Sequence, residues 1–167
     1  MFQIFLSRLG WFLVLLLLQG LVFSHVHIFG YATPMPYVYF LLILPLATPR
    51  WLYVLSGFLM GLCVDLFTNT PGVGAGSTCL AGFLAPFLLR IFSPGDIDDD
   101  AFEPSARSME WSGFMKYAIA LVLVHSVAFF MLEAFSLADW QTLLINMGGS
   151  TLLTTLLVAA MERIRIK

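Results

Sequence analysis

The feature that most constrains this chain is a series of long apolar stretches separated by short polar ones. A membrane helix needs roughly 20 mostly apolar residues to cross about 30 Å of hydrocarbon. Six stretches of the 167-residue sequence meet or nearly meet this requirement. They cover residues 9–29, 34–48, 51–68, 77–92, 113–135 and 141–161. We therefore predict an all-α polytopic membrane protein, folded as a single transmembrane domain of six helices.

The composition excludes the main alternative classes of protein. Hydrophobic residues make up 60% of the chain and charged residues 11%, and the mean hydropathy is +0.93. A soluble domain typically has about a quarter charged residues, and a disordered chain is more polar still. Lys and Arg number 8 against 10 Asp and Glu, for a net charge of −2 without a basic stripe. Nucleic acid is therefore not an expected partner, and the lipid bilayer is.

The basic residues predict the orientation in the membrane. Six spans place both termini, the turn at Arg50 and the segment 93–112 on one side, which then carries every basic residue. These are Arg8, Arg50, Arg90, Arg107, Lys116, Arg163, Arg165 and Lys167. The positive-inside rule identifies that side as the cytoplasm. The second stretch, at about 15 residues, is short for a span, and a re-entrant hairpin is its alternative. A hairpin would move Arg50 to the outside, so six spans with cytoplasmic termini are preferred.

The segment 93–112 is the one sizeable stretch expected outside the membrane. Its acidic residues are Asp96, Asp98, Asp99, Asp100, Glu103 and Glu110. An EF-hand calcium loop needs glycine at its sixth position and glutamate at its twelfth. Counted from Asp96, these positions hold Ala101 and Arg107. We therefore expect a solvated loop without a metal, with docking to a basic partner as the alternative.

The densest local pattern lies in the predicted third and fourth helices. Gly57, Gly61 and Asp65 follow one another at four-residue steps, so they share one helix face. Two glycines one turn apart let another helix backbone approach closely in a membrane. We expect the fourth helix to pack there through a matching row of small residues. That row is Ser77, Ala81 and Ala85.

Asp65 stands out because a lone carboxylate in a membrane is costly unless it is paired, hydrogen-bonded or protonated. The turn that follows contains Pro71, Gly72 and Gly74. Its backbone N–H groups and the N-terminus of the next helix are the expected partners of the carboxylate. We predict that Asp65 pins this turn. Contact with a partner's membrane helix, and transport or catalysis, are the alternatives.

Catalysis has weak support in the sequence. Ser77 at the predicted start of the fourth helix and His125 in the fifth are the residues that an intramembrane serine protease would use. The Gly-x-Ser pattern of such proteases is missing, because Ala75 stands two positions before Ser77. An aspartyl protease needs two carboxylates at one site, and only Glu133 could join Asp65. No catalytic residue, cofactor or metal ligand is therefore expected.

The run Gly61-x-x-x-Asp65-Leu-Phe-x-x-x-Pro71, followed by glycines and another apolar helix, resembles the rod shape-determining protein MreD family. The length and uniform hydrophobicity of the chain are similar to that family as well. Its members typically have one glycine two positions after the proline, whereas this chain has Gly72, Gly74 and Gly76. The acidic segment 93–112 is also no part of the family pattern.

The resemblance implies a non-catalytic, multi-pass scaffold in the bacterial inner membrane that maintains cell shape. Such a scaffold binds MreC directly and shares the cell-elongation complex with MreB, RodA and the elongation transpeptidase. The family is similar in topology to substrate-capture subunits of energy-coupling transporters, so a vitamin-type capture subunit is the alternative function. A homo-oligomer is an open alternative. The expected helix-packing or partner interface comprises Gly57, Gly61, Asp65, Pro71, Gly72, Gly74, Ser77, Ala81 and Ala85.

Overall fold

A computed structural model describes residues 2–23, 33–95, 102–134 and 140–166. The regular structure within these ranges is helical throughout. In chain order the elements are α1 (Phe2–Leu21), the 3-10 helix η2 (Pro36–Val38), α2 (Tyr39–Leu42), α3 (Arg50–Thr68), α4 (Val73–Phe92), α5 (Glu110–Ala134) and α6 (Trp140–Arg165). The prediction of an all-helical chain is confirmed.

The surface of the bundle is suited to hydrocarbon. Four helices, α3 to α6, are long and apolar enough to cross a membrane, and α1 contributes a shorter apolar stretch from Arg8 to Leu21. Large apolar side chains point outward along them, with Leu66 80%, Phe83 63% and Ile164 74% exposed. A soluble protein does not present such continuous apolar surface to water. The chain is a helical membrane protein.

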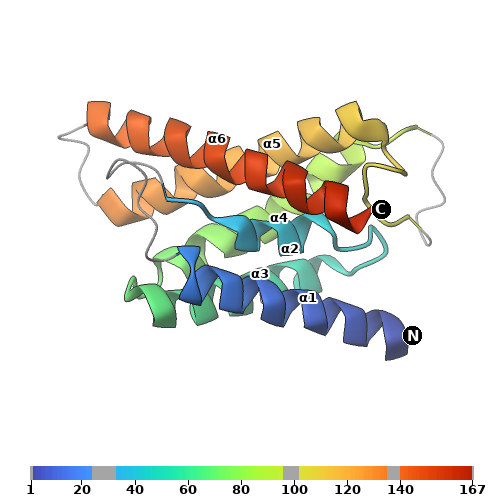
Figure 1. Cartoon of the computed structure of the whole chain (residues 1–167), viewed down its shortest axis with the longest axis horizontal. Helices are drawn as coiled ribbons and strands as arrows, with labels where there is room; N and C mark the ends of the chain where they lie inside the picture. The colour runs from blue at the N-terminus through green and yellow to red at the C-terminus, as the bar shows by residue number, and fades with distance from the viewer. Residues whose placement is uncertain (1, 24–32, 96–101, 135–139, 167) are drawn as a thin grey trace.

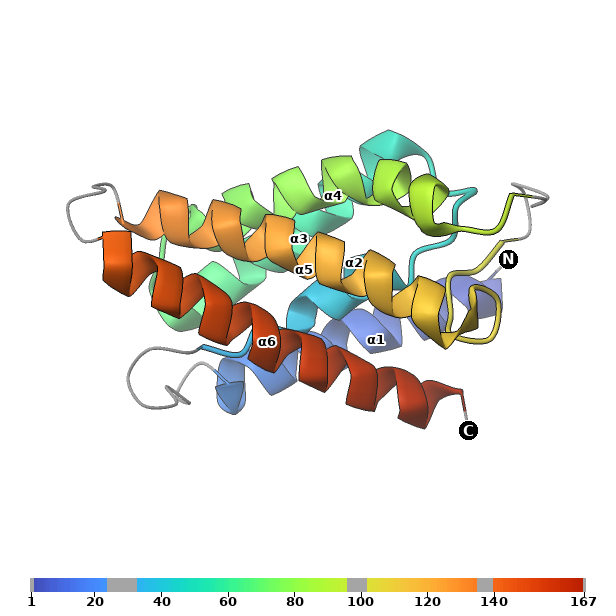
Figure 2. The same ribbon diagram turned by 90° about the horizontal axis from the view of Figure 1, so that it is seen from above.

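Side-chain contacts define two ends of the bundle. At one end the Arg8 guanidinium donates to the Ile43 carbonyl and pairs with Glu103. At the other end the Thr33 backbone N–H donates to the Ser150 hydroxyl. Successive segments run back and forth between these ends, and both termini lie at the Arg8 end (Figures 1 and 2).

The second predicted span, 34–48, crosses the bundle but does not form the single helix that we expected. It contains only the one-turn helices η2 and α2, which lie in the interior in both views (Figures 1 and 2). Pro34, Pro36 and Pro45 lack the N–H that a helix needs and disfavour helical conformation in the residues before them. The residue just before it contacts Ser150 of α6, and Ile43 near its other end contacts Arg8 of α1.

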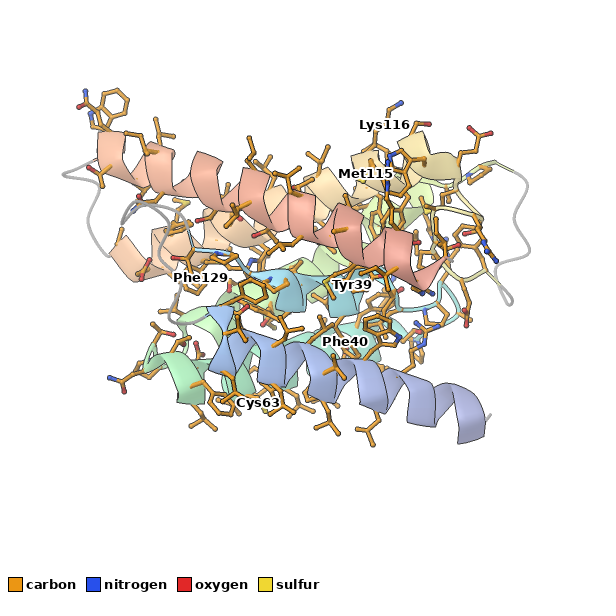
Figure 3. All side chains as sticks on the ribbon, in the orientation of Figure 1. Tyr39, Phe40, Cys63, Met115, Lys116 and Phe129 are labelled. Carbon is orange, nitrogen blue, oxygen red and sulfur yellow. The ribbon has the colours of Figure 1, made fainter. Side chains whose placement is uncertain are left out.

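Irregular backbone at membrane depth is tolerated only where protein surrounds it or where it lines a water-filled cavity. The second pass (residues 33–49) meets this condition, because its central residues from Met35 to Leu44 are all less than a tenth exposed. It runs between α1 and α3 on one side and α6 on the other. Figure 3 shows Tyr39 and Phe40 extending from α2 into this interior.

The other helices differ from the predicted spans mainly at their ends. Helix α3 begins one residue before the predicted span 51–68, and α5 and α6 extend beyond the predicted 113–135 and 141–161 at the Arg8 end. Helix α1 begins at Phe2, so Arg8 lies inside the helix rather than before it. The Arg8 guanidinium is satisfied there by its bonds to Ile43 and Glu103. The part of the predicted span 9–29 beyond residue 23 lies outside the described residues.

The described part of the acidic segment is only partly the solvated loop that we expected, because Glu103 and Glu110 are exposed whereas other residues are not. Ala106 and Met109 are buried against the bundle. The Leu46 N–H donates to the Phe102 carbonyl at 3.1 Å, and Arg165 donates to the Pro104 carbonyl at 3.1 Å. Residues 102–109 therefore close the Arg8 end of the bundle. The aspartates at 96 and 98–100 lie outside the described residues.

Candidate functional site

Asp65 is held by four hydrogen bonds from the turn that follows α3. Its Oδ1 accepts from the Gly74 N–H at 2.7 Å and the Thr70 hydroxyl at 3.0 Å. Its Oδ2 accepts from the Ala75 N–H at 2.9 Å and the Gly72 N–H at 3.0 Å. The carboxylate is only 5% exposed. The prediction that Asp65 pins this turn through its backbone N–H groups is confirmed.

The local sequence builds the donors into the turn. Helix α3 ends at Thr68, and the next residue, Asn69, adopts the left-handed conformation with φ of 56°, a common way to stop a helix. Gly72 then caps α4 with φ of 87°, which glycine reaches without steric cost. The first N–H groups of α4 have no partners within the helix, and the carboxylate accepts from three of them. Helix α4 consequently begins at Val73, four residues before the predicted Ser77.

The backbones of α3 and α4 touch at glycines, as the four-residue spacing predicts. A Cβ atom added to Gly57 would lie 2.5 Å from the Thr78 carbonyl oxygen, and one added to Gly82 would lie 2.6 Å from the Tyr53 carbonyl oxygen. A Cβ atom on Gly61 would overlap Thr78 Oγ1 and the Gly74 backbone. The close α3–α4 pair is therefore confirmed, and larger side chains are excluded at these positions.

The row of α4 that meets α3 is not the one predicted. Gly74 and Thr78 face the glycines of α3, and Gly82 faces the backbone of Tyr53 in α3. The predicted row of Ser77, Ala81 and Ala85 is fully buried, but Ser77 contacts α5. A shift of one residue turns a helix face by 100°. Because small residues line both of these faces of α4, spacing alone did not identify the one that packs against α3.

Ser77 and His125 do meet inside the bundle. Nε2 of His125 lies 3.2 Å from the Ser77 hydroxyl and 3.1 Å from the Tyr37 hydroxyl of the second pass. The Ser77 hydroxyl also donates to the Gly74 carbonyl at 3.0 Å. All three side chains are at most 1% exposed. The cluster therefore joins the second pass, α4 and α5.

Ser77 and His125 stand at the distance of a nucleophile and its base, but the surrounding hydrogen bonds differ from those of an activated serine. An activated serine gives its proton to the histidine, and a third group orients the ring. Here the Ser77 hydroxyl donates to a backbone carbonyl, and two hydroxyls share one ring nitrogen. The other nitrogen, Nδ1, has no hydrogen-bond partner within the described residues. The two residues therefore lie within hydrogen-bond reach of each other, and no third group among the described residues orients the histidine ring through Nδ1.

A second network joins the second pass to α6. The buried residues of α6 follow one another at four-residue steps and form one stripe. They are Ser150, Thr154, Val158 and Glu162. The Ser150 hydroxyl accepts from the Thr33 N–H at 3.0 Å, and the Thr154 hydroxyl accepts from the Met35 N–H at 3.0 Å. The α6 stripe thus supplies partners for backbone groups that the second pass does not satisfy by helix formation.

Glu162 ends the α6 stripe as a buried carboxylate with three partners. Its Oε2 accepts from the Tyr39 hydroxyl at 2.7 Å and lies 3.5 Å from an Arg165 nitrogen. Its Oε1 accepts from the Ala106 N–H at 2.8 Å. Glu162 therefore ties together α6, the second pass and the segment 102–109. Its four-residue spacing from Val158 was the available signal, but the predicted sixth span ended at residue 161.

The remaining chemical candidates form no further site in the described part of the chain. Cys63 and Cys79 are both free thiols. No group of three or more His, Cys, Asp or Glu side chains that could hold a metal ion occurs among the described residues. The Asp65 turn, the His125 cluster and the α6 stripe each bring buried polar side chains together.

Comparison with known proteins adds no relative from which a role could be carried over. No family model, no curated protein and no solved structure matches this chain.

Proposed function

We propose that the protein is a non-catalytic scaffold of the bacterial cell-elongation complex in the inner membrane. It binds MreC directly, acts with MreB, RodA and the elongation transpeptidase, and maintains cell shape. The proposal starts from the resemblance of the run Gly61 to Pro71 to the MreD family. The single observation that supports it most is that the Asp65 carboxylate is hydrogen-bonded entirely by its own chain.

An ionisable residue in a membrane segment is a functional candidate by default. The Asp65 carboxylate, however, accepts four hydrogen bonds from residues 70–75 of its own chain. Gly57 and Gly61 are likewise in close contact with α4. The motif that carries the family resemblance therefore builds a tightly packed α3–α4 hairpin. A hairpin whose polar groups are bonded within the chain suits a protein that positions partners rather than one that transforms a substrate.

This use of the motif changes where partners would bind. The faces of Gly57, Gly61, Ser77, Ala81 and Ala85 are buried within the chain. A partner helix would therefore meet the lipid-facing side chains of the hairpin. Leu62, Leu66 and Phe83, which are 40%, 80% and 63% exposed, are examples.

The orientation belongs to the same proposal: six spans, with both termini in the cytoplasm. It is supported by the second pass, which leads from the Ser150 end to the Arg8 end, and by the positive-inside rule. Insertion of periplasm-active alkaline phosphatase into the full-length chain, so that α6 is present in every fusion, would test it. A fusion after Thr48 should be inactive and one after Thr70 active. An active Thr48 fusion would reverse the assignment of the second pass as a span.

Affinity purification of the tagged protein from its native membranes, followed by mass spectrometry, tests the scaffold role. Recovery of MreC with wall-synthesis enzymes supports it, provided that an equally tagged, unrelated multi-pass protein does not recover them. Recovery of an ATPase-coupled transmembrane partner, or of a vitamin-sized molecule, would instead support the capture-subunit alternative.

The contact between Ser77 and His125 calls for a separate test of catalysis. The cluster contains two hydroxyls, those of Ser77 and Tyr37, and Ser77→Ala removes the one that a serine nucleophile would use. A scaffold should retain rod shape in cells that depend on this variant. Loss of rod shape, with normal expression and an unchanged unfolding midpoint, would favour an enzyme and contradict the proposal.

A further inference from the structure

A groove of about 470 Å³ opens between α1, the second pass and α3. Its walls are apolar over most of their area, with Phe12 from α1, Phe40 from α2, and Leu52 and Leu59 from α3. Ser56 lies in the α3 wall, and Arg8 lines the groove from α1. A volume of this size is in the range of small-molecule sites, which are mostly apolar with a few placed polar groups.

The groove opens toward the membrane rather than into the bundle. Leu52 and Leu59, together with Leu9 of α1, are 38%, 44% and 45% exposed. These exposed side chains belong to helices with long apolar stretches. The groove therefore faces hydrocarbon, and its occupant has to be apolar along most of its length.

Arg8 gives the groove a polar end. Its guanidinium donates to the Ile43 carbonyl and forms an ion pair with Glu103 at 2.8 Å. Glu103 is about half exposed, and ion pairs of that kind contribute little. A guanidinium has five N–H donors, of which these two bonds use two. An anion such as a phosphate could be bound by the remaining donors or could replace Glu103.

The extent of the groove separates two kinds of occupant. Along α3 it reaches from Leu52 to Leu59, which is two helical turns or about 10 Å. A partner's membrane helix would pack along much more of the roughly 30 Å of hydrocarbon. A single acyl chain beneath a charged headgroup needs only such a short apolar slot with a cation at its surface end. Basic positions between membrane helices on the cytoplasmic side are suited to anionic headgroups.

We propose that this groove binds one anionic phospholipid, with an acyl chain between Phe12, Phe40 and Leu59 and its phosphate at Arg8. The site is independent of the scaffold role, because it requires only this chain and the bilayer. The lipid fills the gap between α1 and α3 and thereby fixes α1 against the rest of the bundle.

Native mass spectrometry of the purified full-length protein tests the site. Delipidated protein would be titrated separately with phosphatidylglycerol, which is anionic, and with phosphatidylcholine, which is zwitterionic. We expect one phosphatidylglycerol to bind about tenfold more tightly than phosphatidylcholine. Arg8→Gln should remove most of that preference, and Ser56→Phe, which fills the groove, should abolish the single bound lipid for both headgroups.

Matched controls keep the result specific. Arg107→Gln removes a cation from the same end of the bundle, where Arg107 donates to the Ile166 carbonyl, and should leave the lipid preference unchanged. Leu62→Phe enlarges an exposed α3 side chain outside the groove and should also have no effect. Equal affinity for the two lipids, or unchanged binding by Ser56→Phe, would overturn the proposal. If Arg8→Gln does not fold, Ser56→Phe decides the matter alone. None of these outcomes depends on MreC binding.

Discussion

Two regions of this bundle satisfy buried polar groups with hydrogen-bond partners at very different distances along the chain. The α3–α4 hairpin and the pairing of the second pass with α6 both bury polar groups at membrane depth. In the hairpin, the donors to Asp65 are 5 to 10 residues away along the chain. Between the second pass and α6, the partners are 117 to 123 residues apart. The hairpin is thus a local structure, whereas the second pass depends on the completed bundle.

This difference has consequences for what each region tolerates. The hairpin depends on backbone proximity at glycines, so added atoms should damage it most. The second pass depends on single hydroxyl and carboxylate acceptors, so the removal of one acceptor should cost less. The predictions below test this contrast, beginning with the largest effect.

Gly61→Leu should be the most damaging single change in the hairpin. Its side chain would collide with the Thr78 side chain and with the backbone of Gly74. The Gly74 backbone cannot move away from it without separating α4 from α3. We expect a loss of about 3 kcal/mol or more of unfolding free energy, measured by denaturant unfolding in detergent. Gly10→Leu is the matched control, because nothing lies within 4 Å of a Cβ atom at Gly10. Equal stability of the two variants would contradict the close α3–α4 contact.

Asp65→Asn should be the next most damaging. The amide loses the charge and one acceptor oxygen, and it turns an NH2 group toward donors that now lack a partner. Hydrogen bonds to charged groups contribute about 1.5–3 kcal/mol each, so we expect a loss of about 3 kcal/mol. Thr70→Val, which removes only one of the four donors, should cost about 1 kcal/mol. If both variants lose the same unfolding free energy, the Asp65 carboxylate is not the main hydrogen-bond acceptor that holds the turn.

Glu162→Gln tests the strongest acceptor of the second region. Tyr39 and the Ala106 N–H would lose a charged acceptor, at an expected cost of about 2 kcal/mol. Because Glu162 also holds the segment 102–109, trypsin should cut after Arg107 faster in this variant. The control is Glu110→Gln, an exposed acid at the start of α5. An unchanged cleavage rate would show that Glu162 does not fasten the segment.

Thr154→Val and Thr155→Val form the finest test. The Thr154 hydroxyl accepts from the Met35 N–H, and interhelical hydrogen bonds in membranes contribute about 1 kcal/mol. The Thr155 hydroxyl is buried without a partner among the described residues, so its replacement should change stability by less than about 0.5 kcal/mol. Equal effects in thermal unfolding would mean that the second pass does not rely on the α6 stripe.

The same contrast explains which parts could be predicted from the sequence. The four-residue spacing of Gly57, Gly61 and Asp65 and the glycines that follow are local signals, and they led to the close helix pair and to the partners of Asp65. Hydropathy located α3 within one residue of its start. It also indicated the long helices of the C-terminal half, because a continuous apolar run of that length has few other folds.

The rest was set by contacts that spacing along the chain does not encode. Residues 34–48 are apolar enough for a span, but their prolines prevent one helix, and acceptors that this irregular segment needs come from distant residues such as Thr154 of α6 and Phe102. Which face of α4 meets α3 was ambiguous, because Ala81 and Gly82 are both small. Glu162 lay just beyond an apolar run, where a carboxylate is usually solvated, so its burial could not be foreseen.

The dependence of the second pass on α6 also bears on the order in which the chain can mature. Residues 33–39 leave the ribosome long before Ser150, Thr154 and Glu162 exist. Until then their backbone groups have no acceptor in hydrocarbon, which is costly. The second pass must therefore remain in a polar environment until then, such as the insertion machinery or the membrane surface. Completion of the last helix then becomes the event that commits the second pass to the membrane, so a chain truncated before α6 should be a substrate for quality-control proteases.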